Sequence, residues 1–504
     1  MSNEHKSLQQ IIDFRREKLI RIREAGFNPF AYSFRPSATT QMIQDEGEAG
    51  LEKTHALAGR IVSLRKMGKA SFCHIQDTTG KQQIYVRRDD VGENVYNNLF
   101  KNLDLGDIIG VEGFVFLTQT EELTIHASKI ELLSKSLRPL PNLKEKDGQV
   151  FNLFDDKEQR YRYRHLDLIA NPEVKQVFIL RAAIISALRR FFDDRQYIEV
   201  ETPALQPIYG GASARPFTTH HNTLDQKLYL RIADELYLKR LIIGGFDKVY
   251  ELAKNFRNEG MDRNHNPEYT SLEYYQAYLD VYDMMEITES LFKHVAESVG
   301  KTVLHFGGND INIAEPFQKK SMFELLHEKT GKDVENLDTK GLLELAETYE
   351  LDVTEKMNYG QILDNLFGEL IEPDLIQPVF VYDYPKAISP LAKEKRDGNS
   401  NLVERFELFL GGMEFANAFS ELTDPIDQRE RLESQAKLRE LGDEEAQMVD
   451  ENFLQAMEVG MPPTGGVGIG VDRLVMLFTE QDSIKDVILF PALRPEKNQS
   501  DQED

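Results

Sequence analysis

Arginine and glutamate residues in the second half of the chain have types and spacings suited to binding anions. Arg257 stands two residues before Glu259, and Arg473 follows the glycine-rich run 465–470. A planar guanidinium can hold a phosphate or a carboxylate with two parallel hydrogen bonds. The sequence therefore predicts an anion-binding role for these arginines, with a structural Arg257–Glu259 ion pair as the alternative.

Glu414 and Glu421 form a second candidate pair, seven residues apart, in a segment that begins with Gly411 and Gly412. An odd spacing puts two side chains on opposite faces of an uninterrupted strand. These carboxylates can therefore converge only through a bend, a bulge or a helix. The glycines and the small residues between the two acids favour a tightly packed strand that bends. Two unrelated surface acids are the alternative interpretation.

Several common nucleotide and metal motifs are missing from the sequence. It contains no GxxxxGK[ST] loop, and the run 465–470 is a poor match to a dinucleotide-binding fingerprint because it lacks the strand-turn-helix context and a following acid. Cys73 is the only cysteine, so an internal disulfide framework is excluded, and the scattered histidines cannot build a typical structural zinc site.

The composition predicts a cytoplasmic protein of two or three domains. The chain has 504 residues, no apolar run of membrane-spanning length and no secretory signal at its N-terminus. Its net charge of -25 argues against nucleic-acid binding, but residues 1–35 hold seven basic against four acidic groups. A nucleic acid could therefore dock on the N-terminal third, and a solvated helix face is the alternative.

The hydrophobic pattern divides the chain into distinct regions. Residues 1–55 predict an amphipathic helix over about 5–25 and a connector, and 56–137 predict a five-stranded oligonucleotide-binding barrel, although other small all-β folds have similar patterns. A linker is expected over 138–159. Helices and strands then alternate over 160–496, with an inserted helical module at about 295–375. The polar tail 497–504 is expected to be disordered.

Three ordered segments resemble the sequence motifs of one enzyme family. They are 195–203, 255–273 and 468–473, and they resemble motifs 1, 2 and 3 of the class II aminoacyl-tRNA synthetases. The preceding barrel resembles that of the aspartyl, asparaginyl and lysyl subgroup. Within this subgroup, four strings resemble bacterial lysyl-tRNA synthetases: GGASARPF (210–217), HNPEYT (265–270), FANAFSELTDP (415–425) and MPPTGGVGIGVDRLVMLF (461–478).

This resemblance implies an α+β fold, in which the N-terminal OB-fold barrel precedes an antiparallel catalytic sheet of six or more strands. It also implies a cytoplasmic homodimer that uses ATP to form lysyl-adenylate and then transfers the lysyl group to the 3′ end of tRNA(Lys). Up to three Mg²⁺ ions per subunit are expected. An aspartyl or asparaginyl enzyme and a paralogue without catalytic activity remain as alternatives.

The resemblance also assigns roles to individual residues, with Arg257 and Arg473 as the catalytic pair. It implies ATP binding by Arg257, Glu259, His265, Asn266, Tyr269, Glu414 and Arg473. It implies Mg²⁺ binding by Glu414 and Glu421. It implies lysine binding by Gly211, Glu235, Arg257, Glu259, Tyr275, Asn417, Phe419 and Glu421. None of the lysine-binding side chains beyond Arg257 is a cation, as a site for an ammonium group requires.

Within the lysine site, Glu421 and Tyr275 are expected at the ε-ammonium, Glu235 and Gly211 at the α-amine, and Arg257 with Asn417 at the α-carboxylate.

In the barrel, the residues at the positions that read a U-rich anticodon are Arg65, Phe72, Gln83 and Glu122. Core packing is the alternative role of Phe72, and its alternation with polar residues favours an exposed position.

The sequence departs from the family pattern at three places. Gln196 stands where motif 1 usually has glycine, so the turn there is expected to differ. Asn264 stands where arginine is frequent, which predicts a missing phosphate contact or a substitute in Arg263. Met413 also occupies a position that is often arginine, and it receives no role.

Overall fold

The computed structural model describes residues 7–141, 143–146, 149–152, 154–354, 357–440 and 445–496. The chain divides into two compact units, Met1–Asp156 and Lys157–Asp504, and this division lies inside the linker expected over 138–159. The tail expected over 497–504 lies outside the described residues. In the part of the chain that the structure describes, no helix is long and apolar enough to cross a membrane.

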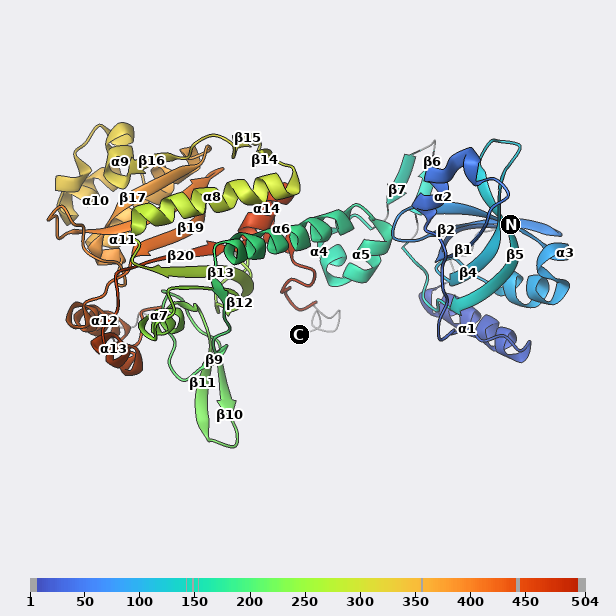
Figure 1. Ribbon diagram of the computed structural model, residues 1–504, viewed down its shortest axis with the longest axis horizontal. Helices are drawn as coiled ribbons and strands as arrows, with labels where there is room; N and C mark the ends of the chain where they lie inside the picture. Colours follow the sequence, from blue (N-terminus) through green and yellow to red (C-terminus); the bar gives the residue numbers. More distant parts are fainter. Residues whose placement is uncertain are drawn as a thin grey trace, which may run out of the picture. The chain divides into compact units, whose positions relative to one another are not determined.

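The N-terminal unit is built around a closed barrel with the strand order β1-β2-β3-β5-β4 (Figure 1). Along β2 and β3 every second residue is buried, because alternate side chains of a strand point to opposite faces. Cys73, Ile75 and Ile84 fill the interior. The predicted five-stranded barrel is therefore confirmed. Its strands are β1 (Thr54–Lys66), β2 (Ala70–Gln76), β3 (Lys81–Arg87), β4 (Ile108–Leu117) and β5 (Leu123–Ser134).

Helix α1 (Leu8–Glu24) matches the amphipathic helix predicted over about 5–25. Ser7 and Gln10 form a capping box, in which each side chain accepts a hydrogen bond from the other residue's backbone N–H. Ile12, Leu19 and Ile22 form the buried stripe of the helix, and Ile22 belongs to the apolar core of the barrel. The remaining elements of this unit are α2 (Thr40–Glu46), α3 (Arg88–Val91), β6 (Leu143–Lys146) and β7 (Gln149–Asn152).

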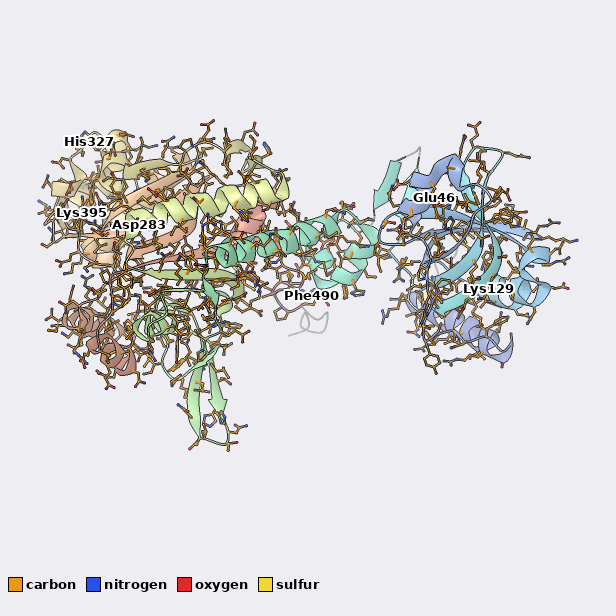
Figure 2. The ribbon with its side chains drawn as sticks, viewed as in Figure 1. Glu46, Lys129, Asp283, His327, Lys395 and Phe490 are labelled. Atoms are coloured by element: carbon orange, nitrogen blue, oxygen red, sulfur yellow. The ribbon has the colours of Figure 1, made fainter. Side chains whose placement is uncertain are left out.

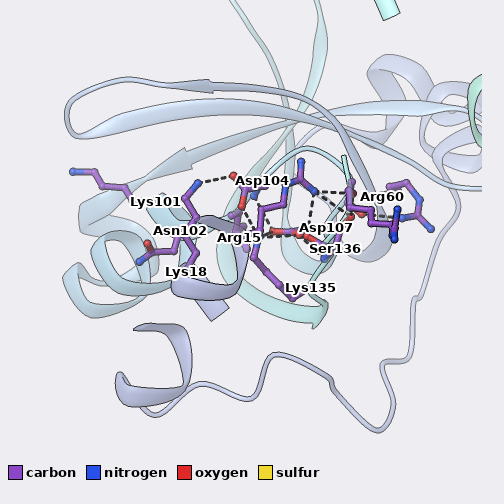
Figure 3. A network of polar contacts seen from close by, with 12 residues as sticks. Arg15, Lys18, Arg60, Lys101, Asn102, Asp104, Asp107, Lys135 and Ser136 are labelled. Atoms are coloured by element: carbon purple, nitrogen blue, oxygen red, sulfur yellow. Dashed lines mark hydrogen bonds and ion pairs between the residues drawn. The ribbon is translucent and has the colours of Figure 1, made fainter. Parts of the chain in front are cut away.

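A buried ion network joins α1 to the barrel (Figure 3). The Lys135 ammonium lies 2.7 Å from Asp104 and 2.8 Å from Asp107, and Lys18 of α1 lies 2.5 Å from Asp104. The side chains of Lys135 and Asp107 have no exposed surface. Because a lone charge is strongly disfavoured in such a position, each member of the network depends on the others.

The second unit is built around an eight-stranded sheet with the order β16-β17-β18-β19-β20-β13-β12-β8. Neighbouring strands from β17 to β12 pair antiparallel, whereas the edge strands β16 and β8 pair parallel. The predicted antiparallel sheet of six or more strands is therefore confirmed. Its strands are β8 (Ile198–Glu199), β12 (Lys248–Phe256), β13 (Glu268–Ala277), β16 (Gln318–Ser321), β17 (Val379–Pro385), β18 (Leu402–Leu410), β19 (Met413–Ser420) and β20 (Thr464–Gly470).

One face of this sheet is covered by helices α6 (Val174–Asp194), α8 (Val281–Val299) and α14 (Val471–Thr479) (Figure 1). Alternate residues of the strands, such as Tyr274 and Ala418, join these helices in one apolar core. The residues between them must therefore face the opposite side. Shorter elements of the unit are α4 (Lys157–Arg162), α5 (Arg164–Ala170), α7 (Glu235–Ile243), α12 (Pro425–Glu440), α13 (Glu451–Glu458), α15 (Ile484–Val487), β9 (Leu205–Gln206), β10 (Thr218–His221) and β11 (Gln226–Leu230).

The segment 295–375, which was expected to be a helical module, contains strands as well as helices. Strands β14 and β15 pair antiparallel with each other, and β16 joins the edge of the main sheet. The helices pack in an apolar core of their own. The elements here are β14 (Val303–Phe306), β15 (Asn309–Asn312), α9 (Met322–Thr330), α10 (Thr339–Thr348) and α11 (Tyr359–Leu370).

The turn after α6 corrects the expectation for Gln196. Gln196 adopts a left-handed backbone with φ 63°, the conformation that glycine favours. The backbone N–H of Tyr197 donates to the Phe192 carbonyl, so the helix closes with a hydrogen bond from two residues beyond its C-cap Arg195. The helix-terminating hydrogen bond therefore forms although glutamine replaces glycine.

The buried network predicts a large difference between two lysine substitutions. Lys135→Met leaves the Asp104 and Asp107 carboxylates without their shared cation and should destabilise the barrel by about 3–5 kcal/mol. Lys129→Met is the matched control, because Lys129 pairs with Glu112 at the surface, where its side chain is 60% exposed (Figure 2). It should cost less than about 1 kcal/mol. Scanning calorimetry of the whole chain measures both, and equal shifts would contradict the prediction.

Candidate active site

The face of the sheet opposite the helices carries two rows of polar and aromatic residues. In the first row, Gly468 of β20 lies between Glu273 of β13 and Asn417 of β19, and Asn417 lies opposite Glu407 of β18. In the second row, Gly466 lies between Tyr275 and Phe419, and Phe419 lies opposite Arg405. The strand register therefore gathers residues from four strands on one surface.

A β-bulge at Phe415 brings Glu414 to the same surface. Leu408 of β18 pairs with Ala416, whereas the next residue, Phe409, pairs with Glu414. Phe415 is therefore an extra residue in β19, and it is buried together with Ala416. The bulge reverses the alternation, so Glu414 and Glu421 both line one cavity. The bulge that the odd spacing required is therefore present, and it puts the two carboxylates on one surface.

The cavity over this surface has a volume of about 670 Å³ and is lined by every residue expected to bind ATP or lysine. This volume is in the range of sites for small molecules and cofactors. The strand register gives the cavity two ends, because Tyr269 and Tyr275 lie six residues apart on β13, roughly 20 Å. Glycines of β20 form the floor: a Cβ atom on Gly466 would lie 2.1 Å from Glu421 Oε1.

The acidic end of the cavity contains Glu235, Glu273 and Glu421 around Tyr275. Lys239 has no exposed surface, and its Nζ lies 2.5 Å from both Glu235 and Glu421. Burial, together with the neighbouring carboxylates Asp234 and Glu235, raises the pKa of Glu273 well above its ordinary value. Burial also raises the pKa of Glu421, although Lys239 opposes the shift. This end therefore holds three carboxyl groups, and two of them, Glu235 and Glu421, share one buried cation.

Gly211 contributes its backbone to the same end. It has φ 87°, and a Cβ atom there would lie 3.1 Å from the Cβ atoms of Ala233 and Glu235. Its N–H donates to Gln447 at 3.2 Å. Only glycine fits this conformation and this spacing without displacement of a neighbour.

The arginine end of the cavity contains Arg257, His265 and Arg473. Arg473 donates to the Glu414 carbonyl at 2.8 Å and to His265 Nε2 at 3.2 Å. Because arginine has no acceptor, Nε2 must accept and Nδ1 must carry the proton, which it donates to Asp262 at 2.8 Å. Arg473 is thereby held between the histidine and the backbone of β19.

Arg257 is free of the ion pair that was its alternative role. Among the described residues, no ion pair joins it to Glu259, and its buried Nε has no hydrogen-bond partner. Its guanidinium lies 5.3 Å from the centre of the Tyr269 ring, so one face of that ring is already covered. Asn266 uses its amide locally, donating to the Glu268 carbonyl at 2.6 Å and accepting from the Ala492 N–H.

Further carboxylates surround Glu414. Burial, followed by the repulsion of Glu414 and Asp364, raises the pKa of Glu372 to about 7. Burial likewise raises the pKa of Glu407 to about 7. Negative charge is therefore concentrated beside Glu414, and hard oxygen donors suit Mg²⁺. In the described part of the chain no three such side chains alone could hold a metal, so phosphate and water oxygens would have to complete the coordination.

The four barrel residues lie on two neighbouring rows of the outer surface. Arg65 lies opposite Phe72, and Phe72 is half-buried with its ring 5.0 Å from that of Tyr85. Gln83 donates to Glu122 at 2.6 Å. Phe72 alternates with the buried interior residues, so the expected outward position is confirmed.

Several residues of the cavity were missed by the sequence analysis as pocket residues. They are Glu273, Arg405 and Glu407, and the buried Lys239, which pairs with the lining residue Glu235, was missed as well. Glu273 could have been found from strand alternation, since it lies two residues before Tyr275. Lys239 could have been found from its helical i,i+4 spacing to Glu235. Nothing in the local sequence marks Arg405 or Glu407, because their partners lie on other strands.

Two of the residues that depart from the family pattern, Asn264 and Met413, can be placed in the structure. Asn264 lines the cavity, whereas Arg263 does not line it and donates to the Asp482 carbonyl at 3.4 Å. The structure therefore gives no support to Arg263 as the substitute phosphate ligand. Met413 packs against the apolar core.

The chain resembles proteins of known class over almost its whole length. Residues 156–494 match the family described as tRNA synthetases class II (D, K and N), and residues 56–133 match the OB-fold nucleic acid binding domain. The chain is 51% identical to the lysine–tRNA ligase of Carboxydothermus hydrogenoformans over 494 residues, 98% of this chain and 99% of that protein. It is also 51% identical to the lysine–tRNA ligase of Christiangramia forsetii over 503 residues, 98% of this chain and 88% of that protein.

A third lysine–tRNA ligase, from Porphyromonas gingivalis, is 49% identical over 501 residues, which cover 97% of this chain and 86% of that protein. The synthetase family model covers well over half of the chain, and each of these relatives is matched over most of its own length. The chain therefore belongs to the class II tRNA synthetases of the D, K and N family, together with the lysine–tRNA ligases.

Proposed function

We propose that the chain activates L-lysine with ATP, releasing pyrophosphate, and transfers the lysyl group to the 3′ end of tRNA(Lys). The observation that carries this proposal is the excess of carboxylate at the acidic end of the cavity. Glu235 and Glu421 share the buried Lys239, and Glu273 lies near Glu235 without an ion pair among the described residues. An amino acid with a second ammonium group compensates this charge, whereas aspartate would add to it.

The reaction needs no protein nucleophile. The lysine carboxylate is already ionised, and one of its oxygens attacks the α-phosphorus of ATP. An O–P bond forms as the bond to the bridging oxygen breaks and pyrophosphate leaves. Arg257 and Arg473 stabilise the negative charge that develops on the phosphate oxygens. In the second step a ribose hydroxyl of the tRNA attacks the lysyl carbonyl, and AMP leaves.

We assign the lysine contacts from the arrangement of the acidic end. Glu421 and Tyr275 hold the ε-ammonium, while Glu235 and the Gly211 backbone hold the α-amine. Arg257 and Asn417 hold the α-carboxylate. The phenol of Tyr275 donates to Glu273 at 3.2 Å, which supports an indirect part for Glu273 in the same contact. Ornithine, one methylene shorter, would be disfavoured by only about 1–3 kcal/mol.

ATP is the second substrate, and the residues present fit Mg²⁺ as its partner. Glu414 and Glu421 would hold the metal, and a bound ion would neutralise phosphate charge. His265 meets the γ-phosphate, and Asn266 and Glu259 complete the nucleotide site. Tyr269 stacks on adenine with the ring face that Arg257 leaves open.

The barrel takes the anticodon of tRNA(Lys). The outward position of Phe72 beside Arg65 supports stacking of an unpaired base, and Gln83 with Glu122 supplies hydrogen-bonding groups next to it.

We also propose that the enzyme is a cytoplasmic homodimer. The short edge strand β8 and helix α6 expose Ile198 and Ile179, at 48% and 59%, where a second subunit could cover them.

Pyrophosphate exchange with each of the twenty amino acids tests the function directly. Exchange should occur with lysine, and only when Mg²⁺ is present, because the acidic end needs a second ammonium and the phosphates need a counterion. Radioactive pyrophosphate incorporated into ATP is the readout. Exchange with aspartate or asparagine would keep the reaction and overturn the lysine assignment. Absence of exchange with every amino acid would overturn the adenylation step in the tRNA-free enzyme.

Glu421→Gln should raise the lysine KM by roughly 10- to 100-fold, because a charge-assisted contact to the ammonium is lost. It should also raise the Mg²⁺ concentration needed for half-maximal exchange. Glu251→Gln is the matched control, since Glu251 is buried and pairs with Arg231 at 2.7 Å but does not line the cavity. Unchanged exchange kinetics in Glu421→Gln would remove Glu421 from both roles.

Arg257→Lys should lower kcat for exchange by roughly 100-fold, since a point charge cannot replace two parallel N–H donors at the developing charge. Arg263→Lys offers a control from the same loop, because that arginine does not line the cavity. Steady-state exchange rates of both variants, measured at saturating lysine and ATP, decide the matter. Similar rates for the two would refute the catalytic assignment of Arg257.

A further inference from the structure

Arg405 is a largely buried arginine of β18, with 12% of its side chain exposed, and it forms several hydrogen bonds within the protein. Its Nε donates to Asn417 Oδ1 at 3.1 Å, and its Nη2 donates to Glu407 at 2.5 Å. Its Nη1 donates to the Ile388 carbonyl at 3.0 Å and to the Ser389 hydroxyl at 2.9 Å. Four of the five guanidinium N–H groups are thereby engaged.

The guanidinium is also held by its surroundings. It lies 4.6 Å from the ring centre of Tyr384 and 5.7 Å from that of Phe419. Tyr384 donates its hydroxyl to Glu407 at 2.9 Å, so the carboxylate that pairs with Arg405 is fixed in turn. Because Glu407 neutralises the guanidinium at close range, Arg405 is poorly suited to attract an anion by itself.

These contacts determine which way the Asn417 amide points. Arginine has only donors, so the atom of Asn417 that faces Arg405 must be the oxygen. The amide nitrogen, which is bonded to the same carbon, then points away from Arg405. Asn417 lines the cavity. With its oxygen engaged by Arg405, the Asn417 side chain can donate from its NH₂ group to a ligand in the cavity.

We propose that Arg405 is a positioning residue for amino-acid activation, which orients Asn417 so that its NH₂ group donates to the α-carboxylate of lysine. This inference rests on the proposed function. Without Arg405 the amide can rotate and turn its oxygen toward the substrate carboxylate, which repels it. The effect of Arg405 on the substrate therefore passes through one hydrogen bond to one amide.

A structural role is the competing explanation, because Arg405 also holds the loop at residues 388 and 389. Arg431 provides a matched control. It is buried, and it donates to the carbonyls of Ser389 and Ala392 in the same loop, but it has no contact with Asn417. Arg431→Met thus loosens the loop and leaves the amide in place.

The experiment compares lysine with L-lysinamide, which keeps both ammonium groups but lacks the carboxylate. In pyrophosphate exchange on the full-length enzyme, Arg405→Met should raise the lysine KM by roughly 10-fold. The inhibition constant of lysinamide should change less than about 2-fold, because its neutral amide has both a donor and an acceptor and can pair with either orientation of the Asn417 amide. Arg405→Lys, which keeps the positive charge and can still donate to Asn417, should recover part of the lysine affinity.

Asn417→Ala should reproduce the selective loss, and the double variant should lose no more than either single one, since both remove the same contact. A parallel loss for lysine and lysinamide in Arg405→Met, or the same selectivity in Arg431→Met, would overturn the inference in favour of a structural role. A selective loss in Asn417→Ala without one in Arg405→Met would overturn the inference alone. No selective loss in Asn417→Ala would overturn the carboxylate role of Asn417 as well.

Discussion

The active-site unit depends on an unbalanced group of buried charges. Glu235 and Glu421 come from a helix and from the end of a strand, and Lys239 joins them at 2.5 Å on each side. Glu273 has no cation of its own, and burial raises its pKa well above the ordinary value. Such an arrangement is unfavourable for folding, because carboxylates lose their hydration. It is retained where a ligand brings the missing positive charge.

Two features of the sheet make this arrangement possible. The bulge at Phe415 reverses the alternation of β19, so that Glu414 and Glu421 share one surface despite their odd spacing. Gly466 leaves the space that Glu421 and Tyr275 occupy, since any Cβ atom would overlap them. A regular strand with larger residues would separate the carboxylates and fill the cavity.

The sequence predicted the barrel, the antiparallel sheet and many residues of the cavity, but it missed Glu273 within one of the ordered motifs. Strand alternation and sequence motifs can be recognised from residues that are close in the sequence. The positions of Phe72, Arg257 and Glu421 could therefore be predicted from the sequence. Side-chain contacts between paired strands could not be, because Arg405 and Asn417 are twelve residues apart and meet only through the register of β18 and β19. The left-handed Gln196 was mispredicted because helix closure outweighs a backbone preference of about 1–2 kcal/mol.

The buried charges also explain why the cavity has two chemically different ends. Lysine carries two ammonium groups and one carboxylate, and the phosphates of ATP carry only negative charge. Acids from α7, β13 and the end of β19 gather around Tyr275, whereas the arginines lie near Tyr269, about 20 Å away along β13. A reversed substrate would place its carboxylate among acids and its side-chain ammonium beside Arg257. Under the proposed function, each wrong contact would be repulsive in a poorly hydrated site, so the charges would orient the reactive carboxylate toward the phosphate as well as select the amino acid.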